Sequence, residues 1–124
     1  MNVVDSSAWV EYFVGGSNAD EFAAAIEATE DLVVPTMCVL EVFKRVTQLR
    51  SESAAMEAVG LMLQGRVVDL NSGIALEAAR ISLDEGFAMA DSIILATARL
   101  EGAILWTQDA HFEGLAGVEF RAKA

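Results

Sequence analysis

The chain begins Met1-Asn2-Val3-Val4-Asp5-Ser6-Ser7, and this stretch indicates how the rest of the sequence is organised. The pair Val3-Val4 is apolar and β-branched, which is typical of a short strand buried on both faces of a parallel sheet. Asp5 follows directly, and an acid at the carboxyl end of an inner strand lies where open α/β sheets bind ligands. Asp5 or either serine can equally cap the helix expected over residues 7–14. This stretch alone therefore leaves a catalytic and a capping role open.

Short apolar runs alternate with longer helical patterns along the whole sequence. Such alternation predicts a parallel sheet with helices on both faces. Strands are expected at residues 2–4, 31–34, 66–70, 103–106 and, at an edge, 118–120. Helices are expected at residues 7–14, 20–28, 37–49, 53–64, 72–86, 90–100 and, as a short turn, 110–113. The predicted fold is a single α/β domain over residues 1–124, in three layers with a mostly parallel central sheet flanked by helices.

Length and composition agree with one globular domain. The chain has 124 residues, of which 54% are hydrophobic, and one domain usually takes roughly 100–200 residues. No apolar run reaches the roughly 18 residues of a membrane span, and the start lacks the basic leader of a secretory signal. Cys38 is the only cysteine, which excludes an internal disulfide and predicts a small core residue rather than a nucleophile. A reducing cytoplasm is the expected location.

The net charge restricts the possible partners. With 8 basic and 19 acidic residues, the formal net charge is −11. A field of this sign opposes loose, charge-driven binding to nucleic acids or to anionic membranes. It is compatible with metal ions and with a basic protein partner. Any role on nucleic acid must therefore depend on a local site.

Four acids occur at comparable places in the predicted fold. Asp5 and Asp109 follow strands, and Glu41 lies one turn into the helix after the second strand, so all three are expected at one sheet edge. Asp91 opens the apolar helix before the fourth strand, and we expect it to reach this edge only through a crossing loop at residues 86–90 or a tilted helix. Carboxylates gathered closely need protons or cations to compensate their charge, and oxygen donors suit Mg²⁺ or Mn²⁺.

Each of these acids also has a purely structural explanation. Glu41 can pair with Arg45 four residues later on a solvated helix face. Asp91 can be an N-cap or a first-turn acid favoured by the helix dipole, and Asp109 can cap the short helix that follows. His111, the only histidine, is expected to be a surface residue of that short helix rather than an acid–base catalyst.

Taken in order, these acids and their neighbours resemble the PIN-domain family and, within it, the VapC toxin ribonucleases of bacterial toxin–antitoxin pairs. The likeness covers almost the whole chain. The segments that carry it are Val3-Val4-Asp5-Ser6-Ser7-Ala8, the helix with Glu41 after Pro35-Thr36, Ala90-Asp91-Ser92-Ile93-Ile94-Leu95-Ala96-Thr97-Ala98, and Thr107-Gln108-Asp109-Ala110-His111-Phe112.

The resemblance implies a metal-dependent endoribonuclease that hydrolyses phosphodiester bonds of single-stranded or looped RNA. It implies Mg²⁺ or Mn²⁺ as the cofactor, with Asp5, Asp91 and Asp109 as ligands and Glu41 orienting or deprotonating the attacking water. The expected site residues are the acids Asp5, Glu41, Asp91 and Asp109 and the supporting hydroxyls of Ser6 and Thr107. Phosphate-binding candidates on the helix with Glu41 are Lys44, Arg45 and Arg50, and ordinary solvated pairs explain these three equally well. As partners it implies RNA and an antitoxin that inserts a basic side chain among the acids.

The helix expected over residues 53–64 is apolar on more than one side. The helix has more apolar residues than one buried face needs, namely Met56, Leu61, Met62 and Leu63. This surplus predicts a homodimer face or a groove for a partner helix.

Two other functions remain open at this point. A receiver-type signalling module would share the α/β alternation, with Asp69 as the phosphate acceptor. The pair Asp5-Ser6 weighs against it, because such modules need paired acids there and a lysine after the last strands, and this chain offers no suitable lysine. A non-catalytic PIN-fold binding protein is the other alternative, and the complete set of four acids weighs against it.

Overall fold

Five short strands form one sheet in the order β3-β2-β1-β4-β5, and every neighbouring pair is parallel. The computed structural model describes residues 1–124. The strands are β1 (Asn2–Val4), β2 (Leu32–Pro35), β3 (Arg66–Val68), β4 (Ile104–Thr107) and β5 (Val118–Phe120). The helices are α1 (Ser6–Val14), α2 (Ala19–Glu27), α3 (Thr36–Leu49), α4 (Glu52–Met62), α5 (Ser72–Glu85) and α6 (Met89–Leu100). Two 3₁₀ turns, η1 (Thr29–Asp31) and η2 (Ala110–Phe112), complete the chain.

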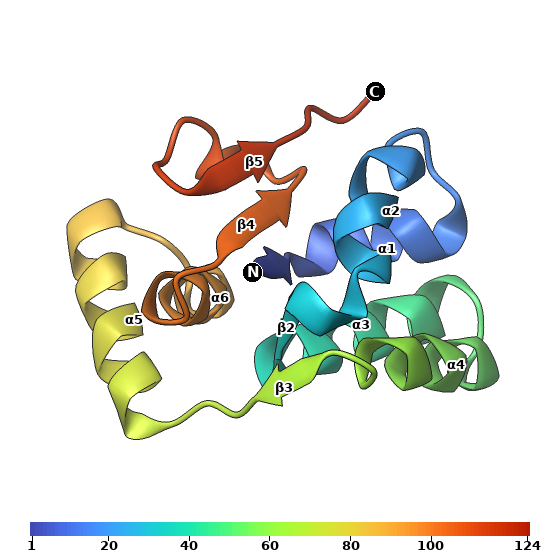
Figure 1. Ribbon diagram of the computed structural model, residues 1–124, viewed down its shortest axis with the longest axis horizontal. Coiled ribbons are helices and arrows are strands. Elements are labelled where there is room, and N and C mark those ends of the chain that lie inside the picture. Colours follow the sequence, from blue (N-terminus) through green and yellow to red (C-terminus); the bar gives the residue numbers. More distant parts are fainter.

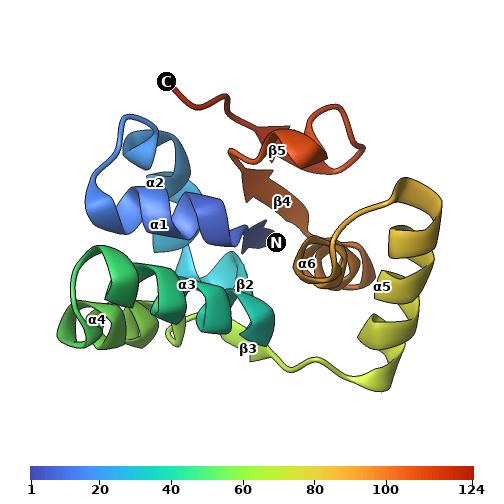
Figure 2. The same ribbon diagram turned by 180° about the vertical axis from the view of Figure 1, so that it is seen from behind.

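The helices cover the sheet in two groups (Figures 1 and 2). Helices α1 to α4 lie on one side, and α5 and α6 lie on the other. Right-handed crossovers require this division, because the chain moves from β1 through β2 to β3 in one direction and returns to β4 in the other. The predicted three-layer α/β architecture is confirmed, and the sheet is wholly parallel.

The core lies between the strands and the helices, and all six helices contribute buried residues to it. Twenty-six buried hydrophobic residues form one cluster, in which Val3, Val4 and Val34 are fully enclosed. In α6, every residue from Ser92 to Ala98 is buried. This confirms the expectation that the nearly all-apolar helix is enclosed on most sides. Its first turn is consequently held rigidly beside the sheet.

Helix α6 begins at the carboxyl edge of the sheet for a simple topological reason. Strand β4 is parallel to β1, so the helix leading into it must run from the carboxyl edge back to the amino edge. The expectation that residues 86–90 must cross the sheet end was wrong, because only residues 86–88 separate α5 from α6. Between β3 and β4 the chain forms two helices, α5 and α6, and Figure 1 shows α5 in the plane of the view and α6 end-on. Asp91 therefore reaches the site edge without a special loop.

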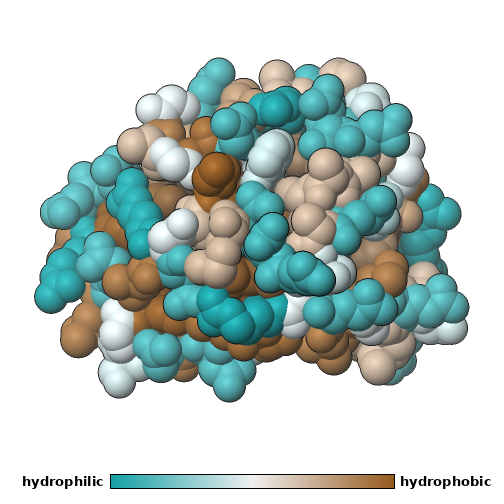
Figure 3. Space-filling view, viewed as in Figure 1, coloured by the Kyte–Doolittle hydropathy of each residue, from teal (hydrophilic) through white to brown (hydrophobic).

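The surface of the molecule is mostly hydrophilic, with scattered hydrophobic patches (Figure 3). Several patches lie in the lower part of this view, where Figure 1 places β3 and α4. Exposed hydrophobic residues of this region are Met56, Leu61, Leu63, Val67 and Leu70. Met62, in contrast, is fully buried, so only part of the predicted apolar surplus faces solvent.

Gly65, in the turn between α4 and β3, lies against the sheet. A Cβ added there would be 3.0 Å from side-chain carbons of Leu32 and Val34 and from the Leu32 carbonyl oxygen. We expect Gly65→Ala to lower the free energy of unfolding by about 1–2 kcal/mol through overpacking. Gly60→Ala, inside α4 with nothing within 4 Å of the added Cβ, should raise it by about 0.5–1 kcal/mol. Urea denaturation of both variants checks this, and equal stability of the two would contradict the packing argument.

Candidate active site

Asp5 lies at the carboxyl end of β1 and is almost completely buried, with 3% of its surface exposed. Its backbone N–H donates to the Trp106 carbonyl oxygen at 2.8 Å, which extends the pairing of β1 with β4. Its Oδ2 atom accepts hydrogen bonds from Ser7 Oγ at 2.7 Å and from Thr107 Oγ1 at 2.8 Å. Both side-chain hydrogen bonds go to the same oxygen, so Oδ1 is left without one.

Glu41 lies on α3 and turns towards the start of α1. Its Oε1 atom accepts a hydrogen bond from Ser6 Oγ at 2.7 Å. The alternative pairing with Arg45 is not formed, since the guanidinium of Arg45 contacts Gln48 Oε1 instead, at 3.5 Å. The side chains of two adjacent residues in the first turn of a helix face different directions. The Ser6 hydroxyl therefore donates to Glu41, while the Ser7 hydroxyl donates to Asp5.

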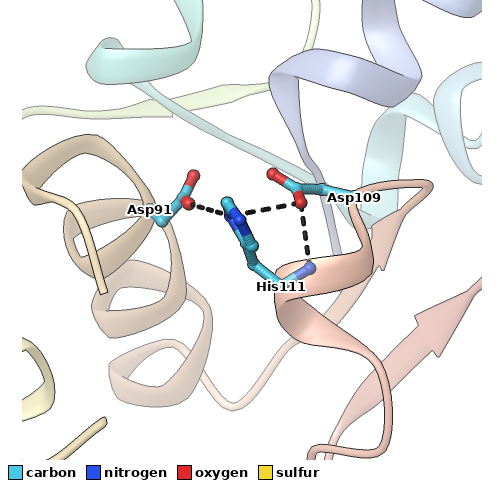
Figure 4. A group of neighbouring side chains, drawn as sticks. All are labelled: Asp91, Asp109 and His111. Atoms are coloured by element: carbon cyan, nitrogen blue, oxygen red, sulfur yellow. Dashed lines mark hydrogen bonds and ion pairs between the residues drawn. The ribbon is translucent and has the colours of Figure 1, made fainter. Parts of the chain in front are cut away.

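Asp91 and Asp109 meet at the imidazole of His111 (Figure 4). His111 Nδ1 is 3.2 Å from Asp91 Oδ2 and 3.3 Å from Asp109 Oδ1. Asp109 Oδ1 also accepts the backbone N–H of His111 at 3.0 Å, so Asp109 does cap η2. His111 was expected at the surface, and its side chain is 71% exposed. Its contact with two of the four acids was not predicted.

Burial and neighbouring charges disfavour the ionised forms of Asp5 and Asp91. The pKa of Asp5 is raised to about 6, chiefly by burial and further by the charges of Asp91 and Asp109, while the hydrogen bonds from Ser7 and Thr107 oppose the shift. Burial also raises the pKa of Asp91, and the hydrogen bond from His111 opposes that shift. Such a cluster is stabilised by a bound cation, which removes both the repulsion and the need for protons.

The donor atoms fit a divalent cation. One ligand atom each of Asp91, Asp109 and His111 lies within 4.8 Å of the other two. Asp5 is close enough for its charge to interact with both aspartates. Carboxylate oxygens are the ligands preferred by Mg²⁺ and Mn²⁺, so Asp5, Asp91 and Asp109 form a suitable set.

A cleft of about 730 Å³ opens beside the acids, between α1, α3 and the start of α6. Its polar lining consists of Ser6, Ser7, Glu41, Lys44, Arg45, Gln48, Gln108 and Lys123. Two of the three predicted phosphate-binding residues, Lys44 and Arg45, therefore face the expected cleft. Arg50 lines a separate hollow against α1 and α4, so the geometry gives it no part in this site.

A model of the PIN domain matches residues 3–118. The chain belongs to the PIN-domain family. No curated protein matches the sequence significantly.

Solved structures share this PIN fold over essentially the full length. A toxin–antitoxin complex from Klebsiella pneumoniae is 21% identical, with a TM-score of 0.82 and complete coverage of both chains. The toxin VapC20 of Mycobacterium tuberculosis, described as cleaving the sarcin–ricin loop, is 18% identical, with a TM-score of 0.79. The match covers 96% of this chain and 99% of that one. VapBC2 from Rickettsia felis, bound to promoter DNA, is 11% identical with a TM-score of 0.72 and coverages of 98% and 97%.

The receiver-type alternative is wrong for this PIN domain. Asp69 is exposed and follows β3, the edge strand. Strand β2 lies between β3 and β1, which carries Asp5. A phosphate acceptor would need to lie beside the metal-binding acids, and the strand order keeps Asp69 away from them.

Proposed function

We propose that this protein is a Mg²⁺- or Mn²⁺-dependent endoribonuclease that acts as the toxin of a toxin–antitoxin pair. The observation that carries the proposal is the juxtaposition of an acid cluster around the buried Asp5 with a cleft that presents Lys44 and Arg45. The acids repel a polyanion unless a cation is bound, whereas the lysine and arginine attract phosphates. Membership of the PIN-domain family supports the same reading.

Each acid is given a role by its surroundings. Asp5, Asp91 and Asp109 would hold the cation, and Thr107 holds Asp5 in the required orientation. The bound cation would lower the pKa of water and stabilise negative charge that develops on the phosphate and the leaving oxygen. Glu41 is fixed by Ser6 at the cleft wall, where it orients the attacking water and accepts its proton.

RNA binding in this chain has to be local. The net charge of −11 repels nucleic acid over most of the surface, so phosphate contacts must come from few side chains. Lys44 and Arg45 are one helix turn beyond Glu41 and line the same cleft. They are placed to bind the phosphates that flank the scissile bond.

The partner of the toxin would be an antitoxin that covers this site. The Klebsiella pneumoniae neighbour is a toxin–antitoxin complex, and a basic antitoxin side chain would neutralise the acid cluster here. The exposed residues Met56, Leu61 and Leu63 provide apolar area for a homodimer. No helix is long and apolar enough to span a bilayer. We place the protein in the cytoplasm, where its RNA substrate and antitoxin would be found.

The proposal predicts discrete, metal-dependent RNA fragments. Partner-free protein, unfolded and refolded after purification, is incubated with total cellular RNA in Mn²⁺, in Mg²⁺ or in EDTA. We expect cleavage with either cation and none in EDTA, because the acids cannot activate water or accept the phosphodiester without a cation. Sequencing of the fragment ends identifies the target. If refolded, partner-free protein left all RNA intact in both cations, the nuclease proposal would be wrong.

A further inference from the structure

We propose that the segment Arg121–Lys123 acts as a strap that holds Lys123 at the mouth of the active site, where its ammonium group binds a substrate phosphate. This inference rests on the proposed ribonuclease function and adds a residue outside every motif recognised in the sequence. Lys123 lines the main cleft together with Lys44 and Arg45. It also lines an adjoining hollow of about 420 Å³ that contains Asp109 and His111.

The strap is tied to the end of β4 that carries the site. The backbone N–H of Arg121 donates to the Thr107 carbonyl oxygen at 2.9 Å. Asn18, from the turn before α2, donates through Nδ2 to the Ala122 carbonyl oxygen at 2.8 Å and to Gln108 Oε1 at 3.1 Å. One amide group thus connects the strap with the residue next to Asp109. Lys123 is consequently held beside the acids rather than left on a free tail.

Arg121 anchors the strap and is not available for substrate. Its guanidinium forms ion pairs with Glu21 at 3.1 Å and Glu119 at 3.2 Å. It also lies over the indole ring of Trp106, with 5.6 Å between the guanidinium carbon and the ring centroid. These contacts fix the first residue of the strap on the molecule. The positive charge that remains near the site is the one on Lys123.

The unpaired cations of this chain gather at the cleft. Of its eight basic side chains, Arg66, Arg80 and Arg121 form ion pairs with carboxylates. The other five form none, and three of these five, Lys44, Arg45 and Lys123, line one cavity. No carboxylate of the chain neutralises these three charges, so they are available to an anion that enters the cleft. A polyanionic strand with several phosphates satisfies all three.

The strap is tested by RNA binding under conditions that prevent cleavage. The probe is a fluorescein-labelled, single-stranded RNA of twelve nucleotides and mixed sequence, with Ca²⁺ in place of Mg²⁺. We expect Lys123→Ala to weaken RNA binding about tenfold, which is the effect of losing one hydrogen bond to a charged group. The slope of the logarithm of the binding constant against the logarithm of the salt concentration should become shallower by about 0.7. Lys123→Arg should keep most of the affinity. Arg99→Ala, at the opposite end of α6, is the matched control and should bind like wild type.

Asn18 is assigned as a positioning residue, and its effect must depend on Lys123. Asn18→Ala should weaken RNA binding in the wild-type background and have no further effect in Lys123→Ala. Because Lys123 is exposed and unpaired, its variants should keep the wild-type unfolding midpoint. If wild type binds and cleaves RNA while Lys123→Ala shows the same affinity and salt slope, the strap proposal is wrong and the nuclease proposal stands. If wild type neither binds nor cleaves RNA, both are wrong.

Discussion

Asp91→Asn is expected to lower the rate of metal-dependent RNA cleavage by at least about a hundredfold, the upper range seen when residues that merely support metal ligands are lost. Asp91 projects from the first turn of α6 towards Asp109 and His111, and one of its oxygens belongs to the group of ligand atoms within 4.8 Å. Asparagine keeps the size of the side chain and its place on a rigid, buried helix. The loss can therefore be assigned to the missing charge. Initial rates at a fixed Mn²⁺ concentration measure it.

Asp69→Asn is the matched control for this loss. The same chemical change is made at an acid that lies after an edge strand, away from the cluster, and cleavage should stay at the wild-type rate. Titration of thermal stability with Mn²⁺ gives a second readout that does not depend on activity. The stabilisation should need at least about tenfold more Mn²⁺ in Asp91→Asn than in wild type. Unchanged cleavage together with unchanged Mn²⁺ affinity would show that Asp91 is not a ligand.

Most of the fold could be predicted because it depends on local patterns. Apolar composition alone predicts burial of the pair Val3-Val4 and of the apolar helix at residues 89–100. Both are enclosed in the structure. The gathering of Asp5 and Asp109 at one edge follows from parallel strands alone. The position of Asp91 required one more step, namely that the helix leading into a parallel strand starts at the carboxyl edge. The helix was expected to start at the opposite edge, and only the family resemblance placed Asp91 beside the other acids.

Helical spacing was less reliable for the cleft wall on α3. Leu49 lies three residues after the buried Val46, in step with the apolar face of this helix, yet it is 43% exposed and lines the cleft. Leu40 is exposed there as well, because this face of α3 borders an open site rather than another helix. Spacing shows which residues share a helix face, but it does not show which neighbours cover that face.

The missed site residues depend on contacts between distant segments. His111 is two residues from Asp109, but its contact with Asp91 spans twenty positions and requires the start of α6 to lie beside η2. Lys123 gives no local signal, because its position depends on Asn18, which is 104 residues away from the carbonyl group that it holds. Arg50 shows the opposite error. It is near Lys44 and Arg45 in sequence, but it lies at the end of α3 and lines another hollow.

Asp5→Asn is expected to stabilise the metal-free protein at neutral pH while it removes a proposed metal ligand. Burial and the neighbouring aspartates raise the pKa of Asp5 from 3.8 to about 6. The folded state therefore binds a proton more tightly than the unfolded chain does. The stability from this proton is complete below about pH 4 and is lost as the pH rises through 6. A shift of this size corresponds to about 3 kcal/mol.

The measurement is urea denaturation in EDTA at pH 7.5 and at the lowest pH where both proteins still fold. At pH 7.5 the free energy of unfolding of Asp5→Asn should exceed that of wild type by about 2 kcal/mol. This is less than the full shift, because Ser7 and Thr107 donate more weakly to an amide oxygen than to a carboxylate. The difference should shrink as the pH falls towards 4, where Asp5 is protonated. Asp69→Asn should show no comparable change at either pH.

Added Mn²⁺ should reverse the order of the two proteins at pH 7.5. The cation neutralises the charge that destabilises wild type, and ligand binding to the folded state adds about 2.7 kcal/mol when the free cation is at a hundred times its dissociation constant. Asp5→Asn has lost a carboxylate and should gain far less. If Asp5→Asn were no more stable than wild type in EDTA, the Asp5 carboxylate would not be under electrostatic strain. If Mn²⁺ stabilised both proteins equally, Asp5 would not be a ligand. The ionised Asp5 carboxylate would thus destabilise the metal-free protein and, for the same reason, favour the binding of a cation.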